Sequence, residues 1–84
     1  MIFLIEYDRQ KEKMVVFEKY KNSERVKAEN KRLDIELNLN RRNIRHEVVL
    51  LEAVTENALK QTHRRYFNSL KISLRDITSD RSTN

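Results

Sequence analysis

The chain has 84 residues, the length of one small domain, and its charge is moderate, with 18 Lys and Arg against 13 Asp and Glu for a formal net charge of +5. It contains no Cys, Gly or Pro, which excludes disulfides, thiolate metal sites and the glycine-rich loops that cradle phosphates. The lack of Cys predicts a cytoplasmic protein. We expect no cofactor and no metal site, because His46 and Glu47 are adjacent and His63 has no His or carboxylate three or four residues away along its helix.

The first predicted element is a β-hairpin. Residues 2–7 and 14–20 are rich in β-branched, aromatic and large apolar side chains, and the polar stretch 8–13 separates them. Asp8 can begin the turn with its own side chain, and a connection longer than a tight two-residue turn is favoured. The apolar run at the start is too short for a membrane span and is followed by Glu6, so we interpret it as a buried strand and expect no membrane contact.

A helix is predicted next, from about residue 23 to 40. Asn22 or Ser23 can cap its first turn with a side-chain oxygen. Apolar residues recur at helical spacing as a main stripe with flanking positions: Val26, Leu33 and Leu37, flanked by Ala28, Ile35 and Leu39. Asn40 and Asn43 are stop positions, because Asn tolerates the left-handed backbone conformation that ends many helices.

The remaining elements are a third strand and a second helix. Residues 47–54 contain the apolar run of Val48 to Leu51, which favours a strand covered on both faces. Thr55 can cap a helix with one broad apolar stripe that includes Leu59, Tyr66 and Phe67, and this helix is expected to continue to about Leu74.

The predicted fold class is α+β. Its element order is ββαβα, a two-layer sandwich with a three-stranded antiparallel sheet of order 2-1-3 and both helices on one face. Residues 1–77 form the single domain, and the polar residues 78–84 form a disordered tail. Because the first strand is apolar on both alternating sets, its other face needs a cover, and we predict a homodimer. The alternative is that the segment with Ile72, Leu74 and Ile77 folds back over that face.

Cationic residues that are distant in the sequence would meet at one end of such a fold. This basic pole consists of Arg9, Lys11, Lys13, Arg41, Arg42, Arg45, His46, His63, Arg64 and Arg65, opposed mainly by Asp8, Glu12 and Glu47. Its natural partner is RNA, DNA or an acidic protein, because neutralising phosphates releases counterions. The residues predicted to bind nucleic acid are Arg9, Lys11, Arg41, Arg42, Arg45, Arg64 and Arg65. Tyr7 and Tyr66 can add stacking on bases. The alternative is that these cations bind no partner, because positive side chains are also favoured at helix C-termini by the helix dipole.

The chain is therefore expected to be a small non-catalytic binding or regulatory module that acts through the basic pole. One alternative is a metal-independent ribonuclease in which His46 and His63 serve as acid and base. Another is a protein-interaction module that uses its exposed sheet face. Glu6 and Glu52 share the strand parity of apolar neighbours, so one of them can be partly buried, but we expect both to be solvated strand-end charges.

Overall fold

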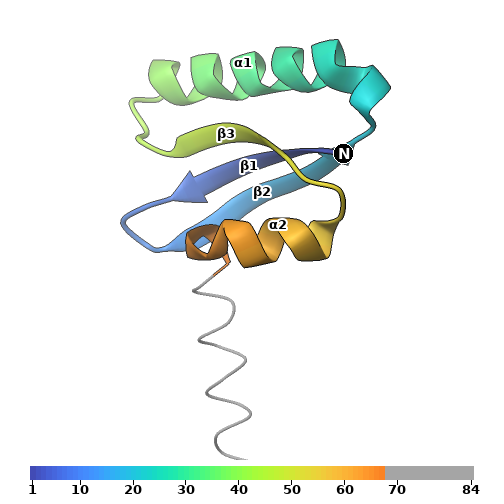
Figure 1. The fold of residues 1–84 in the computed structure, drawn as a ribbon. Helices are drawn as coiled ribbons and strands as arrows, with labels where there is room; N and C mark the ends of the chain where they lie inside the picture. Colours follow the sequence, from blue (N-terminus) through green and yellow to red (C-terminus); the bar gives the residue numbers. More distant parts are fainter. Residues whose placement is uncertain (68–84) are drawn as a thin grey trace, which may run out of the picture.

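A three-stranded antiparallel sheet of order β2-β1-β3 lies between two helices (Figure 1). The computed structural model of the chain describes residues 1–67. Its elements are β1 (Ile2–Asp8), β2 (Lys13–Tyr20), the 3-10 turn η1 (Asn22–Glu24), α1 (Arg25–Arg41), β3 (Glu47–Glu52), α2 (Glu56–Thr62) and the 3-10 turn η2 (Arg64–Tyr66). The predicted α+β class, element order and sheet order are confirmed. The predictions for Leu74, for the segment with Ile72, Leu74 and Ile77, and for the tail 78–84 lie outside the described residues.

The two helices cover opposite faces of the sheet, so the prediction that both lie on one face is wrong (Figure 1). Side chains of β1 alternate between two apolar clusters. One cluster consists of Phe3, Ile5 and Tyr7 with Leu59 of α2, Tyr66 and Phe67. The other consists of Ile2, Leu4 and Tyr20 with Ala28 of α1. The crossover rule fixes only α1, whereas the short connection from β3 lets α2 reach either face, and burial of the second apolar set of β1 favours the opposite one.

The central strand β1 is thus covered on both faces within one chain. The residues from Ile2 to Ile5 are completely buried, as the apolar pattern on both alternating sets predicted. The cover over the second face is α2 with η2, so the uncovered face that led to the prediction of a homodimer does not exist in residues 1–67.

The stripe of α1 that faces the sheet differs from the predicted one. Ala28 and Leu39 are buried, and Ile35 packs against the same cluster. The predicted main stripe points outward instead: Val26, Leu33 and Leu37 are 71%, 53% and 51% exposed. Both sets have the same helical spacing, and the small side chain of Ala28 lets the helix approach β1 and β3 closely.

The predicted helix ends are partly confirmed. At the start of α1 the side-chain oxygens of Asn22 and Ser23 accept no capping hydrogen bond; Glu24 reaches back instead, and its Oε1 accepts the Lys21 N–H at 2.8 Å. Thr55 does cap α2, since its Oγ1 accepts the Ala58 N–H at 3.0 Å.

The helix α2 is shorter than predicted and ends at Thr62. There the Thr62 hydroxyl donates to the carbonyl of Ala58 at 3.0 Å, and the chain turns into η2. The tighter turn aims Tyr66 at Tyr7 and Phe67 at Phe17, with edge-to-face ring contacts at centroid distances of 5.4 and 5.8 Å. These aromatic contacts would be lost in a continuous helix.

Candidate functional site

Three segments that are distant in sequence meet at one end of the sheet. The hairpin turn after Asp8, the connection from α1 to β3, and η2 all lie at the end where β1 finishes (Figure 1). The strand register agrees, because Asp8 pairs with Lys13 and Tyr7 pairs with Glu47 at the start of β3. The segments that carry the basic pole are therefore neighbours in space.

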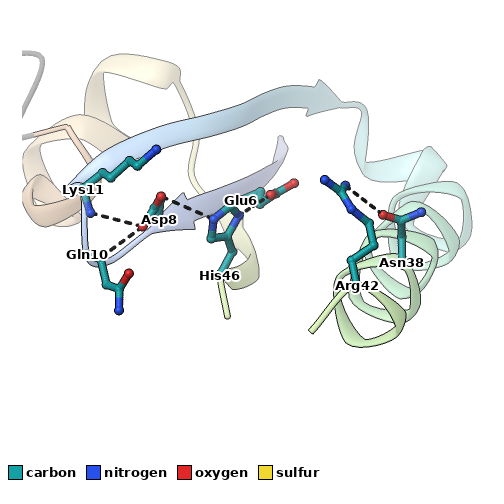
Figure 2. A network of polar contacts seen from close by, with 7 residues as sticks. All are labelled: Glu6, Asp8, Gln10, Lys11, Asn38, Arg42 and His46. Atoms are coloured by element: carbon teal, nitrogen blue, oxygen red, sulfur yellow. Dashed lines mark hydrogen bonds and ion pairs between the residues drawn. The ribbon is translucent and has the colours of Figure 1, made fainter. Parts of the chain in front are cut away.

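Asp8 builds the hairpin turn, as predicted. Its Oδ1 accepts the backbone N–H groups of Gln10 and Lys11 at 3.0 and 3.1 Å (Figure 2). The hydrogen bond from Lys11, with smaller contributions from Gln10 and the nearby His46, lowers the pKa of the Asp8 carboxyl below its ordinary value although burial opposes this. Glu12 takes the left-handed conformation at a φ of 51° that closes the turn. The turn leaves Arg9 and Lys11 exposed to solvent.

The end of α1 is a helix stop centred on Asn43. Asn43 has a φ of 56°, its N–H donates to the Asn40 carbonyl at 3.1 Å, and the Ile44 N–H donates to the Leu39 carbonyl at 2.9 Å. This pattern is the Schellman motif, in which a left-handed residue satisfies the last carbonyls of a helix. It confirms Asn43 as a stop position and presents the exposed Arg41 and Arg45 on either side of the bend.

His46 holds two carboxylates of β1 together (Figure 2). Its Nδ1 lies 2.6 Å from Oε2 of Glu6, and its Nε2 lies 3.4 Å from Oδ2 of Asp8. The side chains of Glu6 and His46 are only 9% and 17% exposed. The expectation that Glu6 is a solvated strand-end charge is therefore wrong, whereas Glu52 is exposed as expected. Glu6 lies two residues after the buried Leu4, so both side chains point to the α1 face of the sheet. This alternation was the signal in the sequence for the burial of Glu6.

Glu47 is the centre of a second polar cluster at the same end. Its Oε2 accepts the hydroxyl of Tyr66 at 2.6 Å and is bonded by Arg65, whose guanidinium also lies over the Tyr66 ring. Burial raises the pKa of the Glu47 carboxyl, but the hydrogen bonds from Tyr66 and Arg65 outweigh it and lower that pKa overall. Tyr7 and Tyr66 are 6% and 4% exposed, so the prediction that they stack on bases is wrong.

The cations of the basic pole differ from those elsewhere in how they are paired. Lys19, Arg25, Lys27, Arg32 and Lys60, which lie outside the pole, each form an ion pair with a Glu carboxylate. Among the arginines and lysines of the pole, within residues 1–67, only Arg65 has a carboxylate partner. Arg42 donates to the Asn38 side chain at 3.3 Å (Figure 2). The cations without a carboxylate partner in that range are Arg9, Lys11, Lys13, Arg41, Arg42, Arg45 and Arg64.

The two histidines of the ribonuclease alternative are not brought together. His46 contacts Glu6 and Asp8 on the α1 face, whereas His63 follows α2 on the opposite face. An acid and a base must both reach the same phosphodiester, and a sheet separates these rings. Among residues 1–67, helices pack on both faces of the central strand β1, so the uncovered face on which the sheet-face alternative relied is not present there.

A metal site and a membrane span find no support in the described part of the chain. Among residues 1–67 no three histidine or carboxylate side chains converge where an ion could be held, since the carboxylates of Glu6 and Asp8 lie against different nitrogens of His46. No helix in that range is both long and apolar enough to cross a bilayer.

Comparison with known proteins adds no assignment to this geometry. No protein-family model, curated protein or solved structure matches the chain.

Proposed function

We propose that this chain is a non-catalytic module that binds nucleic acid through the basic pole. The observation that carries the proposal is the unequal pairing of cations: those of the pole have no carboxylate partner in residues 1–67, apart from Arg65, while most cations elsewhere have one. An unpaired, exposed guanidinium is free to contact a phosphate.

Three carboxylates at the same end support this interpretation, because they are engaged inside the protein, whereas Glu12 of the hairpin turn is exposed. Glu6 faces His46, and Asp8 bonds the backbone of its own turn. Glu47 accepts from Tyr66 and Arg65. These internal partners keep the three acids from competing with phosphates for the cations around them.

The expected mode of binding is contact with the phosphate backbone and not with base edges. The tyrosines at this end are buried, so stacking on bases has no exposed aromatic partner among residues 1–67. Arginines on turns and at a helix end suit phosphate oxygens, and such contacts carry little sequence information. Binding should therefore be weakly selective for sequence and strongly dependent on salt.

A salt-dependent titration tests the proposal. Fluorescence anisotropy of labelled mixed-sequence RNA and DNA is measured with the full chain at several salt concentrations. For about four phosphate contacts, affinity should fall about a hundredfold between 50 and 200 mM salt. The R41E/R45E variant should weaken binding at least about tenfold and flatten the salt dependence, because it removes two phosphate contacts and introduces repulsion.

The matched control reverses two exposed cations outside the pole that have no ion-pair partner within residues 1–67. K21E/K31E changes the net charge by the same amount and should bind almost as the unmodified protein does. Equal losses in both variants would mean that total charge and not the pole matters. Absence of binding at low salt would refute the nucleic-acid function and leave an acidic protein as the partner to test.

A further inference from the structure

We propose that protonation of His46 is a pH-sensitive switch that fixes residues 42–46, the connection between α1 and β3, to the end of β1. With a proton on both ring nitrogens the side chain bonds two carboxylates of β1, and loss of one proton releases the connection. The inference goes beyond the proposed function and does not depend on it, because it concerns the fold of the free protein.

Each ring nitrogen of His46 faces a carboxylate oxygen (Figure 2). Nδ1 lies 2.6 Å from Oε2 of Glu6, and Nε2 lies 3.4 Å from Oδ2 of Asp8. A neutral imidazole has one N–H group, and its other nitrogen only accepts hydrogen bonds. An ionised carboxylate also only accepts, so a neutral ring would place a nitrogen lone pair against one of the two oxygens. The imidazolium form alone offers a donor to both carboxylates.

The three side chains are largely shielded from water, so their charges interact strongly. Glu6, Asp8 and His46 have side chains that are only 9%, 14% and 17% exposed. Glu6 and Asp8 lie two residues apart on β1, and the ring separates their like charges. Salt screens such partly buried charges only weakly. Loss of the positive charge therefore leaves two carboxylates that repel each other across an uncharged ring.

No other charged group within residues 1–67 takes the place of the imidazolium. Among these residues, His46 is the only ion-pair partner of Glu6 and of Asp8. Oδ1 of Asp8 is already bonded to two backbone N–H groups of the hairpin turn. The other acids nearby are Glu36, which lines a groove with His46, and Asp34, which lines a groove with Glu6. The cations nearby are Lys31 and Arg42 beside Glu6, and Lys11, Lys13 and Arg45 beside Asp8.

The switch acts on the connection because His46 makes the polar contacts that join it to β1. The preceding residues bond back to the helix instead, since the N–H groups of Arg42, Asn43 and Ile44 donate to carbonyls of α1. Within residues 1–67, the hydrogen bonds and ion pairs from residues 42–46 to β1 are those of His46. The next residue, Glu47, already belongs to the ladder with β1. Release of His46 therefore loosens the connection and lets this end of the ladder open more often.

The direction of the pH dependence follows from these contacts. The carboxylates meet the ring only in the folded chain, so the bound proton stabilises the folded state. This contribution is present at low pH and is lost as the pH rises and His46 gives up a proton. Histidine side chains change charge between about pH 5 and 8. The connection is therefore fixed at the acidic end of that range and released at the alkaline end.

The amide of Glu47 is a suitable reporter, because it bonds to β1 next to the switch. Met1 and Ala53, at the other end of the same ladder, exchange both hydrogen bonds, at 3.0 and 3.1 Å. In an antiparallel ladder such doubly bonded pairs recur at every second residue, so Tyr7 and Glu47 also exchange both. Hydrogen exchange at the Glu47 amide therefore measures how often the ladder opens beside His46.

NMR of the full chain, without nucleic acid, tests the switch. The ring ¹⁵N shifts of His46 report its protonation, and amide hydrogen exchange reports the opening of the ladder. As the pH rises from about 5.5 to 8.5, across the range of histidine titration, the ring should lose one proton. In parallel, the protection of the Glu47 amide, corrected for the intrinsic pH dependence of exchange, should fall at least about tenfold, the factor that corresponds to one pH unit of coupling.

Two variants and a matched control separate the switch from a general effect of pH. H46Q does not titrate, and its Glu47 amide should have the same low protection at every pH. E6Q removes one of the two carboxylates and should reduce the pH dependence. H63Q is the control, because His63 follows α2 on the opposite face and has no carboxylate partner within residues 1–67. It should respond to pH as the unmodified protein does.

A constant corrected protection of the Glu47 amide, while the His46 ring loses its proton, overturns the proposal. An unchanged pH dependence in H46Q or in E6Q overturns it as well, because another group would then be the sensor. Loss of the pH dependence in H63Q has the same meaning. The titration of the unmodified protein decides the question even if H46Q does not fold.

Discussion

At the scale of single residues, we expect replacement of His46 to lower the free energy of unfolding markedly. This side chain faces the buried carboxylate of Glu6 at 2.6 Å and also lies against Asp8. H46A leaves Glu6 buried without its partner, which costs about 1–3 kcal/mol and more if the carboxylate stays ionised. Urea denaturation should show this as a lower midpoint with an unchanged slope.

A double-mutant cycle with E6Q separates the pair from general loss of packing. If the contact between His46 and Glu6 stabilises the fold, E6Q should cost less in the H46A background than in the unmodified protein. Additive effects would contradict this, because they would mean that the two side chains act independently. The measurement is made at low protein concentration, so that self-association cannot contribute.

The residues that were predicted correctly have roles that depend on their neighbours in the sequence. Asp8 in its turn, Asn43 at a helix stop and Thr55 at a helix start each act through a backbone group a few residues away. The solvation of Glu6 and the base stacking of Tyr66 were predicted incorrectly, because the surroundings of both side chains come from elsewhere in the chain, although the place of Tyr66 on an apolar stripe was correct. The burial of Glu6 depends on a histidine 40 residues later, and no local pattern reports such a partner.

At the scale of elements, α1 shows why periodicity alone does not orient a helix. Two apolar sets with equal spacing lie on nearly opposite sides of it, and burial selects the one with Leu39. We therefore expect L39A to lower the free energy of unfolding by about 2–4 kcal/mol, because it leaves a cavity against the sheet. L37A should cost less than about 1 kcal/mol, since half of that side chain is already in water.

Chemical denaturation at low protein concentration checks both variants. L39A and L37A can be compared directly, because each replaces a Leu by Ala in the same helix. Equal costs would contradict the orientation of α1.

At the scale of the whole molecule, stability should depend on acid through the two polar clusters at the pole. The pKa values of Asp8 and Glu47 are lowered in the folded state from ordinary values of 3.8 and 4.5. The stability that they contribute is fully present above these ordinary values and is lost as the pH falls through the folded ones. The free energy of unfolding should therefore decrease below about pH 4.5.

D8N provides the test, since an Asn side-chain oxygen can still accept the hydrogen bonds of the turn but does not titrate. Denaturation curves across the acidic range should show a smaller decrease in stability for D8N than for the unmodified protein. Parallel decreases in the two proteins would mean that Asp8 contributes nothing to the acid response.

The topology of the sheet could be predicted from the sequence, but the placement of α2 could not. Alternation in β1 and the crossover rule together determine order 2-1-3 and antiparallel pairing. The face chosen by α2 depends on where Phe67 and Tyr66 find aromatic neighbours, which is a property of the assembled sheet. The convergence of the cationic segments followed from topology alone and was predictable for that reason.

The central position of β1 also shapes how the chain folds. It precedes its partners in the chain by a long way: β3 and the aromatic residues of η2 follow some 40 to 60 residues later. Until then its run of Ile2 to Ile5 can pair only with β2 and stays exposed to water on both faces. Such pairings distant in sequence fold slowly, and an exposed apolar strand invites aggregation. Early closure of the hairpin of β1 and β2 therefore limits the exposure of this strand before its other partners are in place.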